Sequence, residues 1–106
     1  MILEKKAVLD RLENDVELYD EICELFKSEG PDLFRKLDFA VQAQDLGQAT
    51  RLAHSLKSTA ANIGAMEMSS CARSAEMAGR CGNLCELRET LPHLEKMLGA
   101  VLAELG

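Results

Sequence analysis

Residues 84–105, Leu-Cys-Glu-Leu-Arg-Glu-Thr-Leu-Pro-His-Leu-Glu-Lys-Met-Leu-Gly-Ala-Val-Leu-Ala-Glu-Leu, carry the pattern that decides the fold. Apolar residues recur there at steps of three and four, at Leu84, Leu87, Leu91, Leu94, Leu98, Val101 and Leu105. This spacing predicts one apolar seam along a helix, of the coiled-coil type. Pro92 interrupts the seam. The helix therefore either begins near Thr90, with the proline in its first turn, or begins near Asn83 and bends at the proline.

The composition extends the helical pattern to the whole chain. The 106 residues include 17 Leu and 13 Ala but only 4 Val, 3 Ile and 3 Thr, and 4% of them are aromatic. Leu and Ala are strong helix formers, whereas β-branched and aromatic residues favour strands. A chain of this length fits one compact domain. We therefore expect a single all-α domain over residues 1–106.

Apolar spacing and helix-breaking residues predict four earlier helices. A short helix over 3–13 precedes a long segment from Asp15 to about Gln44, and helices over about 48–62 and 65–80 follow. Gly30-Pro31 interrupts the long segment, but its apolar stripe resumes in phase, which favours one bent helix over two. The stripe is Leu18, Ile22, Leu25, Phe26, Leu33, Leu37, Ala40 and Val41. Short connections between four substantial helices indicate an antiparallel four-helix bundle, with the short first helix capping one end.

Charge and apolar content exclude several classes of protein. The net charge of -6 and pI of about 4.9 disfavour a nucleic-acid partner, because binding phosphates requires a basic surface. No apolar stretch approaches the ~18 residues of a membrane span, and the N-terminus lacks the apolar region of a signal peptide. We therefore expect a cytoplasmic protein that is not inserted in a membrane.

The four cysteines, Cys23, Cys71, Cys81 and Cys85, do not form a recognisable zinc motif. Cys81 and Cys85 lie four apart and could share one helix face, but no second pair completes a site. We expect reduced thiols that are buried or half-buried, and no metal.

His54 does not belong to the core of its predicted helix. At about 100° per residue, His54 lies roughly 150° from the centre of the core stripe. That stripe is Ala49, Leu52, Ala53, Leu56, Ala60 and Ile63. Lys57 is one turn further on, and Thr50, Ser58 and Ala61 form a low collar of small side chains. We expect an exposed imidazole with good steric access.

An imidazole in this setting is suited to accepting a phosphoryl group. A histidine has a neutral, nucleophilic form at physiological pH, and the Lys57 ammonium would favour that form and attract a phosphoryl oxygen. A solvated histidine without a task is equally compatible with this helix alone. His93 follows Pro92 and has no comparable collar, so we expect it to be a structural or surface residue.

Residues 53–65, Ala-His-Ser-Leu-Lys-Ser-Thr-Ala-Ala-Asn-Ile-Gly-Ala, resemble the signature of histidine-containing phosphotransfer (HPt) domains, approximately A-H-x-L-K-G-x-A-x-x-(I/L)-G-A. The resemblance implies a four-helix bundle in which His54 is the phosphoacceptor, Lys57 is the cation beside it and Gly64 closes the helix. A polar residue 22 positions after the histidine often lies near the imidazole in this family, and here it is Glu76. Ser58 departs from the signature, which usually has glycine there.

Two roles remain open for Glu76. It could form an exposed ion-pair network with Arg73 and Arg80, which lie three before and four after it on the 65–80 helix. It could instead accept a hydrogen bond from the non-reacting nitrogen of His54 and fix the tautomer. The small residues of the 65–80 helix would let the two helix axes approach closely enough for that contact.

The resemblance implies a phosphocarrier of a multistep two-component phosphorelay, which moves a phosphoryl group between receiver-domain aspartates through His54. The expected partners are response-regulator receivers or a hybrid sensor kinase, met by a monomer. No cofactor and no kinase activity are expected, with Mg²⁺ only on the receiver. Three alternatives remain: the phosphoaccepting domain of a chemotaxis-type kinase, a helical adaptor without chemistry, and a metalloprotein that uses His54, His93 or the cysteines.

Overall fold

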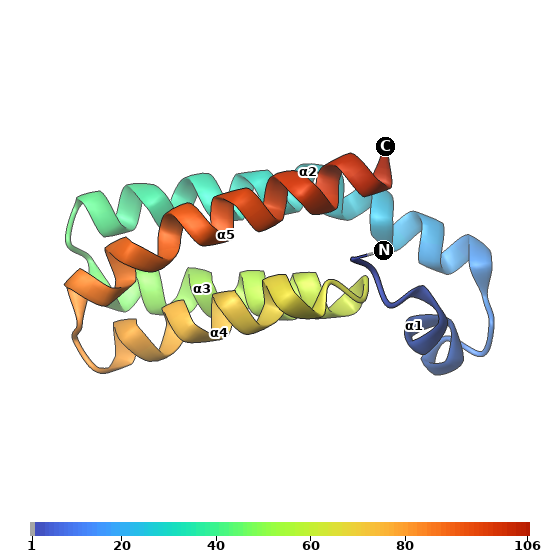
Figure 1. The fold of residues 1–106 in the computed structure, drawn as a ribbon, viewed down its shortest axis with the longest axis horizontal. Coiled ribbons are helices and arrows are strands. Elements are labelled where there is room, and N and C mark those ends of the chain that lie inside the picture. Colours follow the sequence, from blue (N-terminus) through green and yellow to red (C-terminus); the bar gives the residue numbers. More distant parts are fainter. Residues whose placement is uncertain (1) are drawn as a thin grey trace.

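The computed structural model describes residues 2–106, which contain five helices and no strand. The helices are α1 (Lys5–Arg11), α2 (Val16–Gln42), α3 (Leu46–Asn62), α4 (Met66–Arg80) and α5 (Leu84–Leu105). Helices α2 to α5 run antiparallel in a bundle with extents of 41 × 22 × 20 Å, and α1 lies across one end (Figure 1). The predicted all-α four-helix bundle is confirmed. In this described part, no helix is both long and apolar enough to cross a bilayer.

Both prolines lie inside helices. Helix α2 runs through Pro31, so the prediction of one helix across Gly30-Pro31 is confirmed. Helix α5 runs through Pro92 and begins at Leu84, which is the second of the two alternatives for the last segment. Gly30 is buried against α5, where a Cβ would lie 3.3 Å from a methyl of Leu98, so a small residue suits this contact.

The three turns that connect α2 to α5 share one backbone design. Each contains one residue with a positive φ after the helix end: Gln44 (59°), Gly64 (84°) or Gly82 (70°). The N–H of the next residue then donates to the carbonyl five residues earlier at 2.9 to 3.0 Å, which is the Schellman motif. That same residue is the N-cap of the next helix, and the side chains of Asp45 and Asn83 each accept an N–H of its first turn. The turns are therefore short, and Gly64 closes α3 as predicted.

Helix α1 is fixed to the α3–α4 turn. The N–H of Glu4 donates to the carbonyl of Gly64 at 3.0 Å, and the buried hydroxyl of Tyr19 donates to the carbonyl of Ile63 at 3.1 Å. A Cβ on Gly64 would lie 2.9 Å from the backbone of Glu4, so this contact requires glycine in addition to the positive φ. The prediction that the first helix caps one end of the bundle is confirmed. That helix is shorter than the predicted 3–13.

The predicted core is correct for α3 and α5 and partly wrong for α2. All six predicted core residues of α3 are buried, as are Leu87, Leu91, Leu94, Leu98 and Val101 of α5. In α2, Leu18 and Leu25 are exposed, and Tyr19 and Cys23 are buried in their place. The buried residues Tyr19, Cys23, Phe26 and Gly30 follow steps of four and three, so the buried face is rotated from the one predicted.

The cysteines correct two further predictions. Cys81 caps the end of α4 and Cys85 lies in the first turn of α5, so they do not share one helix face. Both are exposed, whereas Cys23 is buried and Cys71 half-buried, and all four are free thiols. Burial raises the pKa of the Cys23 and Cys71 thiols, which keeps them protonated. Residues 2–106 contain no group of three His, Cys, Asp or Glu side chains that could hold a metal ion.

Candidate functional site

Helices α3 and α4 pack closely because the residues between them are small. Both helices carry fully buried alanines, Ala49, Ala53 and Ala60 in α3 and Ala72 and Ala75 in α4. Gly79 continues this row, and a Cβ there would overlap the Thr50 hydroxyl. A hydrogen bond from Ser69 Oγ of α4 to the carbonyl of Lys57 at 3.0 Å joins the same two helices. Polar side chains of α4 can therefore reach across to α3.

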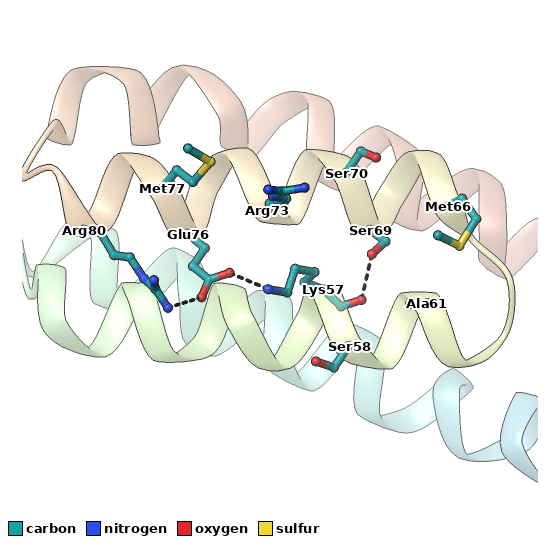
Figure 2. Close-up of a pocket in the computed structure, with 10 residues that line it drawn as sticks. All are labelled: Lys57, Ser58, Ala61, Met66, Ser69, Ser70, Arg73, Glu76, Met77 and Arg80. Atoms are coloured by element: carbon teal, nitrogen blue, oxygen red, sulfur yellow. Dashed lines mark hydrogen bonds and ion pairs between the residues drawn. The ribbon is translucent and has the colours of Figure 1, made fainter.

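Glu76 of α4 is the centre of the polar network between these helices. Its side chain is 4% exposed, and its Oε2 lies 2.8 Å from Nδ1 of His54. Lys57 Nζ donates to Oε1 at 2.8 Å, and Arg80 Nη2 donates to Oε2 at 2.8 Å. Figure 2 shows the Lys57 and Arg80 side chains directed at this carboxylate from opposite sides.

The network fixes the ionisation of Glu76. The hydrogen bond from Lys57, with the one from His54, lowers the pKa of Glu76 from 4.5 to about 2, although burial acts in the opposite direction. An ionised carboxylate can only accept hydrogen bonds, so the proton between the two residues belongs to Nδ1 of His54. The lone pair of the neutral ring is then on Nε2. The His54 side chain is 55% exposed, so solvent and a partner can reach the ring that carries this nitrogen.

The geometry answers the questions that the sequence left open about Glu76. Its contact with His54 exists, and the ion pair with Arg80 exists as well. The pairing with Arg73 does not appear among the ion pairs of the described residues. Lys57 lies one turn after His54 on α3. Its ammonium donates a hydrogen bond to Glu76, and the sequence analysis did not predict that contact.

An open groove of about 590 Å³ lies along α3 and α4 beside this network (Figure 2). Its lining residues are Lys57, Ser58, Ala61, Met66, Ser69, Ser70, Arg73, Glu76, Met77 and Arg80. Ser58 and Ala61 of the predicted collar line the groove, whereas the half-buried Thr50 lies under Gly79 and does not. On the α4 side, Arg73 and Arg80 were named only as ion-pair partners of Glu76, and Met66, Ser70 and Met77 were missed, although their spacing of four and three residues was visible in the sequence. His93 is exposed on α5, as expected.

Comparisons with known proteins agree with this fold. Residues 21–104 match the family model described as Hpt domain. The fold is similar to the crystal structure of histidine-containing phosphotransfer protein B (HptB) from Pseudomonas aeruginosa PAO1, with a TM-score of 0.90 and 22% sequence identity. That match covers 98% of this chain and 90% of the other. No match is found among curated proteins.

Proposed function

The chain belongs to the Hpt domain family, whose members carry a phosphoryl group on a histidine in two-component phosphorelays, and we propose that His54 is the histidine that does so here. The observation that carries this proposal is the contact between His54 Nδ1 and the ionised Glu76 at 2.8 Å. It leaves Nε2 as the nucleophile on a ring that is more than half exposed. An accessible nitrogen with its lone pair already in place is what an incoming phosphoryl group requires.

The transfer is a displacement at phosphorus. The lone pair of His54 Nε2 forms a bond to the phosphorus of an aspartyl phosphate on a receiver, and the bond from phosphorus to the aspartate oxygen breaks. The aspartate leaves as a carboxylate, and the imidazole ring gains a positive charge while Nδ1 keeps its proton. Glu76 stabilises that charge from 2.8 Å. In the second half-reaction the aspartate of another receiver attacks the same phosphorus, and the ring leaves as neutral imidazole.

Lys57 is proposed to stabilise charge on the phosphoryl group in flight. Its ammonium has three N–H donors, and one of them is used by Glu76. The side chain is 28% exposed, so a further donor can be directed at a phosphoryl oxygen. The bond to Glu76 holds the ammonium on the side of α3 that carries His54.

Ser58, Ala61 and Thr50 are proposed to form the part of the docking surface closest to His54. All three side chains are small, so a receiver can bring its aspartate close to the imidazole. The Ser58 hydroxyl, which is exposed, can donate to a phosphoryl oxygen. A surface of this size suits a transient complex of the small-interface kind.

The remaining parts of the reaction are proposed to come from the partners. These are response-regulator receiver domains or a hybrid sensor kinase, with Mg²⁺ held on the receiver and no cofactor held by this chain. We propose that the chain has no kinase activity of its own and acts as a monomeric single domain over residues 1–106 in the cytoplasm. In that arrangement this chain supplies a nucleophile and fixed charges, and the receiver supplies the carboxylate and the metal ion.

The test is phosphotransfer from a panel of ³²P-labelled receiver domains to wild type and to His54→Gln. Wild type should acquire label that is acid-labile and base-stable, as expected for a phosphohistidine. His54→Gln should acquire none while its circular dichroism remains that of wild type, because the substitution is at an exposed position. Label that persists in His54→Gln would exclude His54 as the acceptor.

A further inference from the structure

The α4 side of the groove forms a continuous stripe. Met66, Ser70, Arg73, Met77 and Arg80 follow each other at steps of four, three, four and three residues, so they lie on one face of the helix. All five are exposed and all line the groove. Figure 2 shows these side chains spread along α4 above the α3 side chains Lys57 and Ser58. We name this set the α4 stripe.

The charge of the groove has the opposite sign to that of the whole chain. Its lining contains Lys57, Arg73 and Arg80 but only one carboxylate, that of Glu76. The formal charge is therefore positive there, although the chain carries -6. An acidic partner would be repelled by most of the surface and attracted to this groove, which orients its approach.

Arg73 is the groove cation that forms no ion pair within the described part of the molecule. Lys57 and Arg80 both donate to Glu76, and each Glu76 oxygen is occupied. Arg73 is exposed and takes part in none of the side-chain hydrogen bonds or ion pairs formed among residues 2–106. A guanidinium presents its donors in a fork that matches a carboxylate. Arg73 is therefore free to bind an acidic group of a partner.

The two methionines give the same surface an adaptable apolar part. Met66 is 43% exposed and Met77 is 55% exposed, and they stand on either side of Arg73. Methionine side chains are flexible and polarisable, so they can repack against partners of different shape. A phosphocarrier binds a donor and an acceptor at one histidine, so a surface that can repack against two different partners suits it.

Resting on the function proposed above, we propose that the α4 stripe is a docking surface for the receiver domain and that Arg73 is a positioning residue that binds an acidic side chain beside the receiver's phosphoaccepting aspartate. Two observations select this occupant. The groove is lined by Glu76 and Lys57, which also form the site of His54, and its charge is complementary to a partner whose reacting centre is a carboxylate. Arg73 acts on the affinity and orientation of the receiver and does not touch the phosphorus.

The test measures the steady-state KM and kcat of transfer, with the receiver that phosphorylates wild type fastest as the substrate. Arg73→Gln should raise KM about tenfold with a much smaller change in kcat, since one charge-assisted contact is lost. Arg88→Gln is the matched control, because Arg88 is an exposed arginine on α5 away from this groove and its loss changes the net charge equally. It should leave KM within about twofold of wild type. Arg73→Lys should recover part of the loss, because it keeps the charge without the fork.

Salt dependence provides the second readout. The KM of wild type should rise with ionic strength, and it should rise less steeply for Arg73→Gln, because fewer charges then attract the receiver. If Arg73→Gln and Arg88→Gln have equal KM values and equal salt dependence, the inference about Arg73 is wrong while transfer through His54 stands. If no receiver phosphorylates wild type, or if His54→Gln is still phosphorylated, the proposed function fails and the inference fails with it.

Discussion

Replacing Glu76 with glutamine tests the centre of the site through protein stability. The substitution keeps the shape of the side chain but removes the charge that Lys57 and Arg80 face. Hydrogen bonds to charged groups contribute about 1.5–3 kcal/mol when shielded from water, whereas exposed ion pairs contribute under about 1 kcal/mol. The Lys57 side chain is 28% exposed and that of Arg80 is 66% exposed, so the bond with Lys57 dominates. We expect Glu76→Gln to lower the free energy of unfolding by about 2–3 kcal/mol near neutral pH.

The pH dependence of this difference has a definite sign. The pKa of Glu76 is about 2 in the folded chain, below its ordinary value of 4.5, so its stabilising effect is complete above pH 4.5 and is lost as the pH falls toward 2. The gap in stability between wild type and Glu76→Gln should therefore be present above about pH 5 and should shrink at lower pH.

The assay is urea unfolding followed by circular dichroism at about pH 7 and about pH 3, where the gap should be full and reduced respectively. Glu95→Gln is the control, because Glu95 is exposed on α5 and its side chain takes part in none of the side-chain hydrogen bonds among residues 2–106. It should change the free energy of unfolding by less than about 0.5 kcal/mol at either pH. A loss below about 0.5 kcal/mol for Glu76→Gln at neutral pH, or a gap unchanged by acid, would refute the role given to Lys57 and His54 in holding this carboxylate.

Three further outcomes are expected. Gly79→Ala should lower the free energy of unfolding by about 1–3 kcal/mol in urea titrations, because the added Cβ overlaps the Thr50 hydroxyl. Adding Thr50→Ala should restore part of the loss. Additive effects of the two substitutions would show that the two sites are not in contact. Lys57→Ala should slow phosphotransfer from a labelled receiver about tenfold or more without unfolding the domain, and Lys57→Arg should rescue it only partly; a rate equal to wild type with every donor removes Lys57 from the mechanism. Ser58→Trp should block transfer by bulk while helical content is kept, as measured by label transfer and circular dichroism; normal transfer would place the receiver elsewhere.

The long helices were predictable because their apolar spacing is regular. The stripe of α2 keeps its phase through Gly30-Pro31, which favours one helix running through the proline. The seam of α5 leaves two starting points open, near Thr90 or near Asn83, and the structure has the second. The exposure of His54 followed from the angle between that residue and the core stripe of α3, which depends only on helix geometry.

The errors occurred where burial depends on contacts between distant segments. Tyr19 is buried and its hydroxyl donates to the carbonyl of Ile63, 44 residues along the chain, whereas Leu18 and Leu25 of the predicted stripe are exposed. Local spacing carries no information about that contact. The contacts of Glu76 with His54 and Lys57 likewise join two helices, so local spacing along α4 does not give them.

The closely packed α3–α4 contact has a consequence for the direction in which phosphoryl groups move. Because Glu76, Lys57 and Arg80 hold each other in place before any receiver arrives, His54 presents the same nitrogen in the same orientation to every partner. Under the function proposed above, a donor and an acceptor therefore meet the same phosphohistidine, and the carrier gives neither of them an advantage. The net direction is then set by mass action, through the relative amounts of phosphorylated and unphosphorylated receivers. A reversible reservoir of this kind equilibrates whichever receivers share it, and the receiver that loses its phosphate fastest drains the others.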